Sequence, residues 1–212
     1  MTNVETSTKS ISYQYNADGI RTQKTVGSVT TDFFLDGSRI VAQKSSDNNK
    51  VMWFYYDANG TRDAVKYNGE IYYYFYNGQG DVLGMYDNDL NVVALYTYDS
   101  WGVCSATNGS GGTLAADSIG ALNPFRYRGY YYETETGFYY LQSRYYDPNT
   151  GRFISADDVE YLGANETVDS YNLFAYCGND PVNMSDPSGK WPQFIVSFFL
   201  KELVKGFAVS FV

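Results

Sequence analysis

Histidine does not occur anywhere in this sequence of 212 residues. It is both a common general base of enzymes and the commonest metal ligand of proteins. Its absence excludes a Ser-His-Asp triad and a Cys-His pair, and it removes most zinc sites. Any catalysis by this chain must therefore depend on carboxylates, and the sequence predicts neither a bound metal nor a cofactor.

Cysteine is scarce as well, because the chain contains only Cys104 and Cys177. The two residues are far apart in the sequence and form no Cys-x-x-Cys unit, so neither a metal cage nor a framework of disulfides is indicated. A bond between them requires Cα atoms within about 7 Å of each other, which a sequence cannot reveal. Whether they pair stays open at this point.

Basic residues are outnumbered: 15 Lys and Arg stand against 24 Asp and Glu, which gives a net charge of −9. A surface that binds nucleic acid needs clustered basic side chains to neutralise phosphates. The composition therefore predicts no nucleic-acid partner, and it also disfavours acidic glycans and phosphorylated ligands.

Long apolar runs are missing too. Residues 1–5 have neither a basic start nor an apolar stretch, so no signal peptide is recognised, and we interpret the sequence as part of a longer chain. The apolar run at 194–200 is followed by Lys201 and Glu202. It is far shorter than the roughly 20 residues that cross a bilayer, so we predict no membrane span.

Aromatic residues are abundant, with 23 Tyr, 13 Phe and 3 Trp. Aromatic side chains suit a pleated, half-buried surface, and Tyr can pack its ring while its hydroxyl stays in water. The composition therefore predicts an all-β protein.

A unit of about 20 residues repeats through the first half of the chain. Each copy has alternating aromatic residues, then Asp or Asn, and a Gly three residues later, which is typical of a strand that ends in a tight turn. Single hairpins cannot bury an apolar face, so we expect them to stack into one continuous sheet with the tyrosines as core and ladder residues. Copies lie at residues 13–19, 54–60, 74–80 and 96–102, with a weaker copy near 33–37.

These units resemble the tyrosine-aspartate (YD) repeats of the RHS (rearrangement hot spot) family, which is in turn similar to the shell of teneurins. The following block resembles the RHS repeat-associated core domain, which closes the repeat array. The resemblance implies a hollow spiral of β-hairpins. It predicts a repeat array over 1–122, the core domain over 123–190, and the start of a variable C-terminal region over 191–212, where we expect a short helix. The motifs that carry the core-domain resemblance lie at 137–141, 153–157 and 186–189.

The resemblance also implies a function. In toxin-bearing members the shell encloses a C-terminal toxin or effector, and the core domain cuts its own chain just after an Asp-Pro-x-Gly-Leu signature, which here implies cleavage after the motif at 186–189. The expected partners are the chain's own C-terminal effector region and possible external ones, an immunity protein or a cell-surface glycan. The expected location is secreted or at the surface of a bacterium.

Carried over by motif, Asp157 and Asp186 form the catalytic pair and Arg144 supports them. Two carboxylates that share a proton can act as acid and base, and a neighbouring Arg keeps one of them ionised. Each aspartate also suits a turn, because its side chain can accept hydrogen bonds from the following amides, and this alternative stays open.

The expected cleavage region is Gly189, Lys190 and Trp191. The sequence departs from the family here, because Lys190 stands where the family usually has Leu. We expect a charged residue at this position to slow or abolish cleavage.

Two other functions stay open. The first is a structural or adhesion module that binds carbohydrate or a cell-surface protein, with Trp53 and Trp101 as the first residues expected to stack on sugar rings, followed by Trp191. The second is a truncated remnant without activity, whose open sheet edges would pair with other chains.

Overall fold

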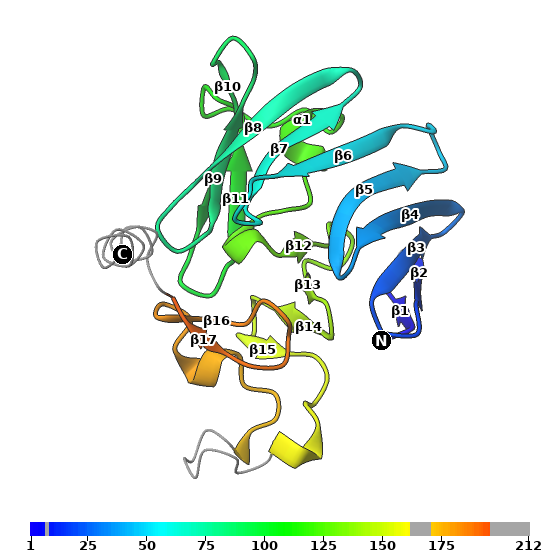
Figure 1. The fold of residues 1–212 in the computed structure, drawn as a ribbon, viewed down its shortest axis with the longest axis vertical. Coiled ribbons are helices and arrows are strands. Elements are labelled where there is room, and N and C mark those ends of the chain that lie inside the picture. The colour runs from blue at the N-terminus through cyan, green and yellow to red at the C-terminus, as the bar shows by residue number, and fades with distance from the viewer. Residues whose placement is uncertain (7–8, 162–170, 196–212) are drawn as a thin grey trace, which may run out of the picture.

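A computed structural model describes residues 1–6, 9–161 and 171–195. These residues form antiparallel sheets of eleven, four and two strands with a few short helical turns (Figure 1). The prediction of an all-β fold is confirmed. The predicted C-terminal helix falls mainly on residues 196–212, which lie outside the described part, while Gln193–Phe194 form a strand.

The eleven-stranded sheet is a meander in which every strand pairs with the next one in sequence. Its first half consists of β1 (Asn3–Glu5), β2 (Ser10–Tyr15), β3 (Arg21–Val26), β4 (Val29–Asp36), β5 (Arg39–Ser45) and β6 (Val51–Tyr56). Its second half consists of β7 (Arg62–Tyr67), β8 (Glu70–Tyr76), β9 (Val82–Tyr86), β10 (Val92–Tyr98) and β11 (Cys104–Thr107). The stacked hairpins expected from the repeats are therefore present.

The repeat motif forms the turns of this meander. In the turn after β6, Asp57 Oδ1 accepts hydrogen bonds from the amides of Asn59 and Thr61, each at 2.8 Å, and Gly60 has a φ of 82°. The turn after β9 has the same bonds around Asp87 but places Leu90 at a φ of 64°. The sequence pattern missed that copy because Leu stands where Gly was expected.

A second sheet packs against the first. It contains β12 (Tyr131–Tyr132), β13 (Tyr139–Leu141), β14 (Arg144–Asp147) and β15 (Arg152–Phe153), which pair in that order. Its rings join one core with the alternating apolar residues of the large sheet. Phe33 meets Tyr131 edge to face at 5.5 Å, and Figure 1 shows β12–β14 within the arc that β1–β11 describe.

Buried charges connect the two sheets. Glu133, just after β12, is completely buried and forms ion pairs with Arg21 and Lys24 of β3; its Oε2 lies 2.9 Å from Lys24 Nζ. The Arg21 guanidinium also lies over the ring of Tyr140, 4.3 Å from its centroid. Lys24 makes a second ion pair with Glu135 at 3.1 Å. These contacts fix β3 of the array to the block formed by residues 123–190, which we call the core block.

The remaining elements are short. They are α1 (Ile119–Leu122), the 3-10 turns η1 (Tyr127–Gly129), η2 (Val159–Tyr161) and η4 (Cys177–Asn179), and the hairpin of β16 (Met184–Ser185) and β17 (Gln193–Phe194). A second aromatic core, with Tyr127, Tyr139, Tyr146 and Tyr176, lies inside this block. Both cysteines are free thiols, so Cys104 and Cys177 do not pair with each other.

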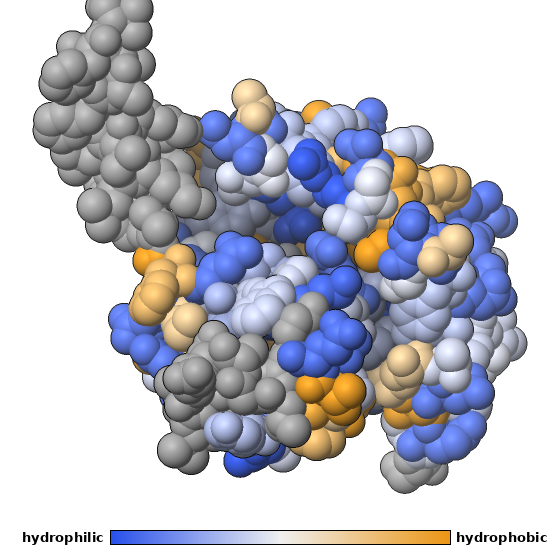
Figure 2. All heavy atoms as spheres, turned by 60° about the horizontal axis from the view of Figure 1, so that its bottom comes forward, coloured by the Kyte–Doolittle hydropathy of each residue, from blue (hydrophilic) through white to orange (hydrophobic). Residues whose placement is uncertain are grey.

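On the face of the molecule shown in Figure 2, apolar residues form separate patches between hydrophilic ones. Within the described residues, no helix has the length and apolar character needed to cross a membrane.

Candidate functional site

The turn of the last hairpin presents the Asp-Pro-Ser-Gly motif. Strands β16 and β17 pair through Met184 with Phe194, so residues 186–189 lie near the tip between them. Asp186 accepts a hydrogen bond from the Lys190 amide at 3.0 Å through Oδ1, and its own amide donates to the Tyr130 hydroxyl at 2.8 Å. The Asp186 side chain therefore shapes the turn, as the turn interpretation expected, and it is also fixed to the core block.

Arg144 lies at the centre of the site. Its Nη2 is 2.8 Å from Asp157 Oδ2 and 3.4 Å from Asp186 Oδ2, so one guanidinium nitrogen contacts both carboxylates. Its Nε donates a hydrogen bond to the Gly189 carbonyl, and the guanidinium lies 3.6 Å from the centroid of the Phe153 ring. The residues predicted from the motifs thus lie together in the structure, although they come from distant parts of the sequence.

Asp157 reaches the site because the chain returns beside β15. The Asp157 amide donates to the Leu173 carbonyl at 3.0 Å, and the same carbonyl accepts from Arg144 Nη1 at 3.2 Å. The Asp157 side chain is 16% exposed, whereas that of Asp186 is 1% exposed. Asp157 is therefore partly accessible to water, whereas Asp186 is buried.

This difference in burial separates the two acids chemically. Burial raises the pKa of Asp186, and the Arg144 charge and the amides of Lys190 and Gly189 offset only part of that rise. Burial also lowers the pKa of Arg144 despite the two carboxylates, but an arginine remains a cation at neutral pH. A buried acid with a raised pKa is suited to donate a proton.

The peptide bond between Gly189 and Lys190 is held on both sides. The Gly189 carbonyl accepts hydrogen bonds from Arg144 Nε and from Ser143 Oγ, the latter at 2.7 Å. The Lys190 amide donates to Asp186 on the opposite side. Hydrogen-bond donors on the carbonyl and a carboxyl group at the nitrogen are what hydrolysis of an amide requires.

Gly189 is the residue that this geometry demands. Its φ is 69°, and an added Cβ would lie 2.6 Å from the Leu141 carbonyl oxygen and 2.8 Å from Ser143 Oγ. No other residue fits between these atoms without displacing the turn after β13.

Two residues of the site were missed in the sequence. Ser143 directly precedes Arg144, so its position was a usable signal. Tyr130 gave none, because nothing in the sequence shows that its hydroxyl meets the Asp186 amide from 56 positions away.

The three tryptophans predicted to bind sugars lie in different surroundings. Trp53 on β6 is 51% exposed, and Trp191 is 43% exposed. Trp101 is partly buried and packs on the core block, where its ring would meet a Cβ at Gly151 at 2.9 Å. Binding of carbohydrate by these residues stays a prediction.

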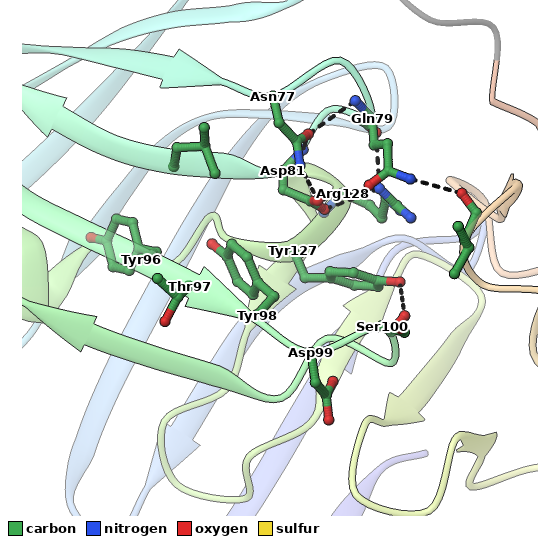
Figure 3. A pocket seen from close by; sticks show the side chains of 12 residues that line it. Asn77, Gln79, Asp81, Tyr96, Thr97, Tyr98, Asp99, Ser100, Tyr127 and Arg128 are labelled. Carbon is green, nitrogen blue, oxygen red and sulfur yellow. Dashed lines mark hydrogen bonds and ion pairs between the residues drawn. The ribbon is translucent and has the colours of Figure 1, made fainter.

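An open pocket of about 390 Å³ lies between the turns after β8 and β10 and η1 (Figure 3). Its polar groups hold the chain segment before β16: Arg128 Nη2 donates to the Pro181 carbonyl at 2.6 Å, and Gln79 Nε2 donates to the Val182 carbonyl at 2.8 Å. Arg128 is itself fixed by an ion pair with Asp81 at 3.2 Å. The residues that line this pocket therefore anchor the segment that leads to Asp186.

Comparisons with known proteins identify the family of this chain. A family model, the teneurin YD-shell, matches residues 1–182. The chain is 36% identical over 187 residues to the tRNA3(Ser)-specific nuclease WapA of Bacillus spizizenii and to the tRNA nuclease WapA of Bacillus subtilis. The match covers 87% of this chain but 8% of each relative, so this chain spans a small part of their length.

Among solved structures, the crystal structure of TcdB2-TccC3-Cdc42 is similar with a TM-score of 0.65. The match covers 86% of this chain and 9% of that chain at 21% sequence identity. This likeness concerns the fold alone.

Proposed function

Because this chain belongs to the teneurin YD-shell family, we propose that it closes a longer shell, which encloses a C-terminal effector and frees it by cutting its own chain after Gly189. The shell-type role follows from the family. The single observation that supports self-cleavage is that Arg144 and Asp186 both contact the peptide group between Gly189 and Lys190, while Arg144 also pairs with Asp157.

Each residue has a role in this proposal. Asp157, the more accessible of the two carboxylates, removes a proton from the attacking water. Arg144 donates to the Gly189 carbonyl oxygen, on which negative charge develops as water adds. Asp186, in its protonated form, gives its proton to the Lys190 nitrogen, which leaves as an amine.

The division of the chain follows the same proposal. Residues 1–122 are the repeat array, 123–190 the core domain that carries the site, and 191–212 the start of the region to be released. Relatives named as tRNA nucleases support a toxic enzyme as the enclosed region of the longer chain. A toxin of this kind implies secretion or display at the cell surface and an immunity protein in the producing cell.

The 212-residue chain allows a direct test. We expect fragments 1–189 and 190–212 to appear with first-order kinetics that do not depend on protein concentration, as followed by intact-mass spectrometry and denaturing gels. Asp157→Asn and Asp186→Asn should each stop cleavage. Asp147→Asn is the matched control, since Asp147 also precedes a proline and its side chain caps a turn, where it accepts hydrogen bonds from Asn149 and Thr150.

The departure at Lys190 is tested alongside. Lys190→Leu restores the residue usual in the family and should cleave at least as fast as the parent chain. A parent that stays intact, together with an intact Lys190→Leu variant, would contradict self-cleavage and favour the remnant without activity.

A second candidate function, the binding of cell-surface carbohydrate, has one specific observation in its favour. Phe34 is 50% and Trp53 51% exposed, and both pair in register with Ala42 of the strand between them, so the two rings flank one position on the same face. A glycan array probed with the parent chain and with Trp53→Ala tests this. Equal signals from both would count against it.

A further inference from the structure

A hydroxyl group lies beside the Gly189 carbonyl in addition to the three motif residues. It belongs to Ser143, in the turn between β13 and β14, whose Oγ is 2.7 Å from Gly189 O and 2.8 Å from Ser188 O. We propose that Ser143 is a further catalytic residue of self-cleavage, which donates to the Gly189 carbonyl oxygen and stabilises the negative charge that develops there. This inference rests on the proposed function.

The hydrogen bonds of this turn leave the Ser143 hydroxyl proton available to the Gly189 carbonyl. A serine hydroxyl has one proton and can donate to one acceptor at a time. The Ser188 carbonyl already accepts a hydrogen bond from the backbone amide of Ser143 at 3.2 Å. The hydroxyl proton is thus available for Gly189, whose other donor is Arg144 Nε. Two donors aimed at one carbonyl oxygen form an oxyanion hole.

The turn holds this hydroxyl in place. Its first central residue, Gln142, has a φ of 62°, and the Ser143 amide donates to the Leu141 carbonyl at 2.8 Å in addition to its bond to Ser188. On the other side, Gly189 lacks the Cβ that would lie 2.8 Å from the hydroxyl oxygen. The close approach of Ser143 to the carbonyl therefore depends on glycine at position 189.

The reaction balances with water as the only co-reactant. The water oxygen bonds to the Gly189 carbonyl carbon, and the electron pair of the C=O bond moves to the oxygen held by Ser143 and Arg144. Asp157 takes a proton from the water, and protonated Asp186 transfers its proton to the nitrogen as the C–N bond breaks. Ser143 keeps its own proton throughout, so it acts as a hydrogen-bond donor and no acyl-enzyme forms.

The rate of cleavage of the 212-residue chain tests the role of Ser143. Removal of one oxyanion donor slows enzymes by about 10²–10³-fold. For Ser143→Ala we expect a smaller loss of rate, about 10- to 100-fold, because this residue is solvent-exposed. Ser143→Thr keeps a hydroxyl and should retain most of the parent rate. Ser105→Ala, at an exposed serine of β11, is the matched control and should cleave like the parent.

The free energy of unfolding in urea is measured for every variant, so that a slower cleavage can be distinguished from a loss of folded protein. Cleavage of Ser143→Ala at the parent rate would overturn the inference while self-cleavage stands, and so would a slow Ser143→Thr variant that is folded. If only Lys190→Leu cleaves, the Ser143 variants are measured in that background. If neither the parent chain nor Lys190→Leu cleaves, the proposed function is overturned, and this role of Ser143 with it.

Discussion

Replacing Glu133 with Gln removes a buried charge and keeps the shape of the side chain. Burial alone would raise the pKa of Glu133, but the charges of Arg21 and Lys24 outweigh it and hold that pKa below its usual range. Glu133 is therefore a carboxylate at neutral pH. The substitution leaves the Arg21 guanidinium, whose side chain is 0% exposed, without a countercharge.

The expected loss of stability is large. Removal of one partner from a buried ion pair costs about 3–5 kcal/mol, because an uncompensated charge stays buried. A typical domain has about 5–15 kcal/mol in total, so the variant should unfold at a much lower urea concentration. Glu135→Gln is the matched control: among the described residues Glu135 forms an ion pair with Lys24 alone, and its side chain is 17% exposed, so we expect a loss of about 1 kcal/mol or less.

Urea unfolding followed by tryptophan fluorescence gives both values. The double variant Arg21→Met with Glu133→Leu should recover most of the loss, because it buries no unpaired charge and Lys24 keeps Glu135. The parent should also lose stability as the pH falls through the lowered pKa of Glu133, and Glu133→Gln should lose less over that range. Equal losses in Glu133→Gln and Glu135→Gln would refute the assignment of Glu133 as the charge that fixes β3 to the core block.

Three further predictions concern the site and the thiols. Gly19→Ala, at a φ of 75° with open space around it, should lower the free energy of unfolding in urea by about 1–2 kcal/mol. Gly189→Ala should lower it further and block cleavage, because the added Cβ would meet the Leu141 carbonyl oxygen. Equal losses of stability in the two variants would contradict this. The cleavage rate should fall as the pH rises through the raised pKa of Asp186, since the protonated acid is the proton donor; a rate that rises throughout would reverse the assigned roles. Burial raises the pKa of Cys177 to about 12, so its thiol should react with a disulfide reagent only after urea unfolds the chain, whereas rapid modification of the folded protein would show that it is accessible.

The repeats were predictable because their information is local. Asp57 and Gly60 shape their turn through bonds to residues at most four positions away, so the motif can be read without the rest of the chain. The grouping of Arg144, Asp157 and Asp186 was predictable only through the family resemblance. Composition and spacing do not show that these residues meet.

The remaining features depend on contacts between distant residues. Arg21 and Glu133 are 112 positions apart, and neither is marked by its neighbours as half of a buried pair. The motifs also suggested no role for the Tyr130 hydroxyl, whose place under Asp186 depends on the packing of the second aromatic core. Such contacts are determined by the three-dimensional packing of side chains rather than by a pattern along the chain.

The anchoring of Pro181 and Val182 by Arg128 and Gln79 has a consequence for the order of events during synthesis. Gln79 belongs to the turn between β8 and β9, so its hydrogen bond to the segment that leads to Asp186 can form only after these two strands have paired. In the proposed mechanism, a chain in which β8 and β9 have not paired lacks the Gln79 contact that helps to align the Gly189 peptide with its acids. Folding of this part of the shell is thus expected to precede cleavage and release of the effector.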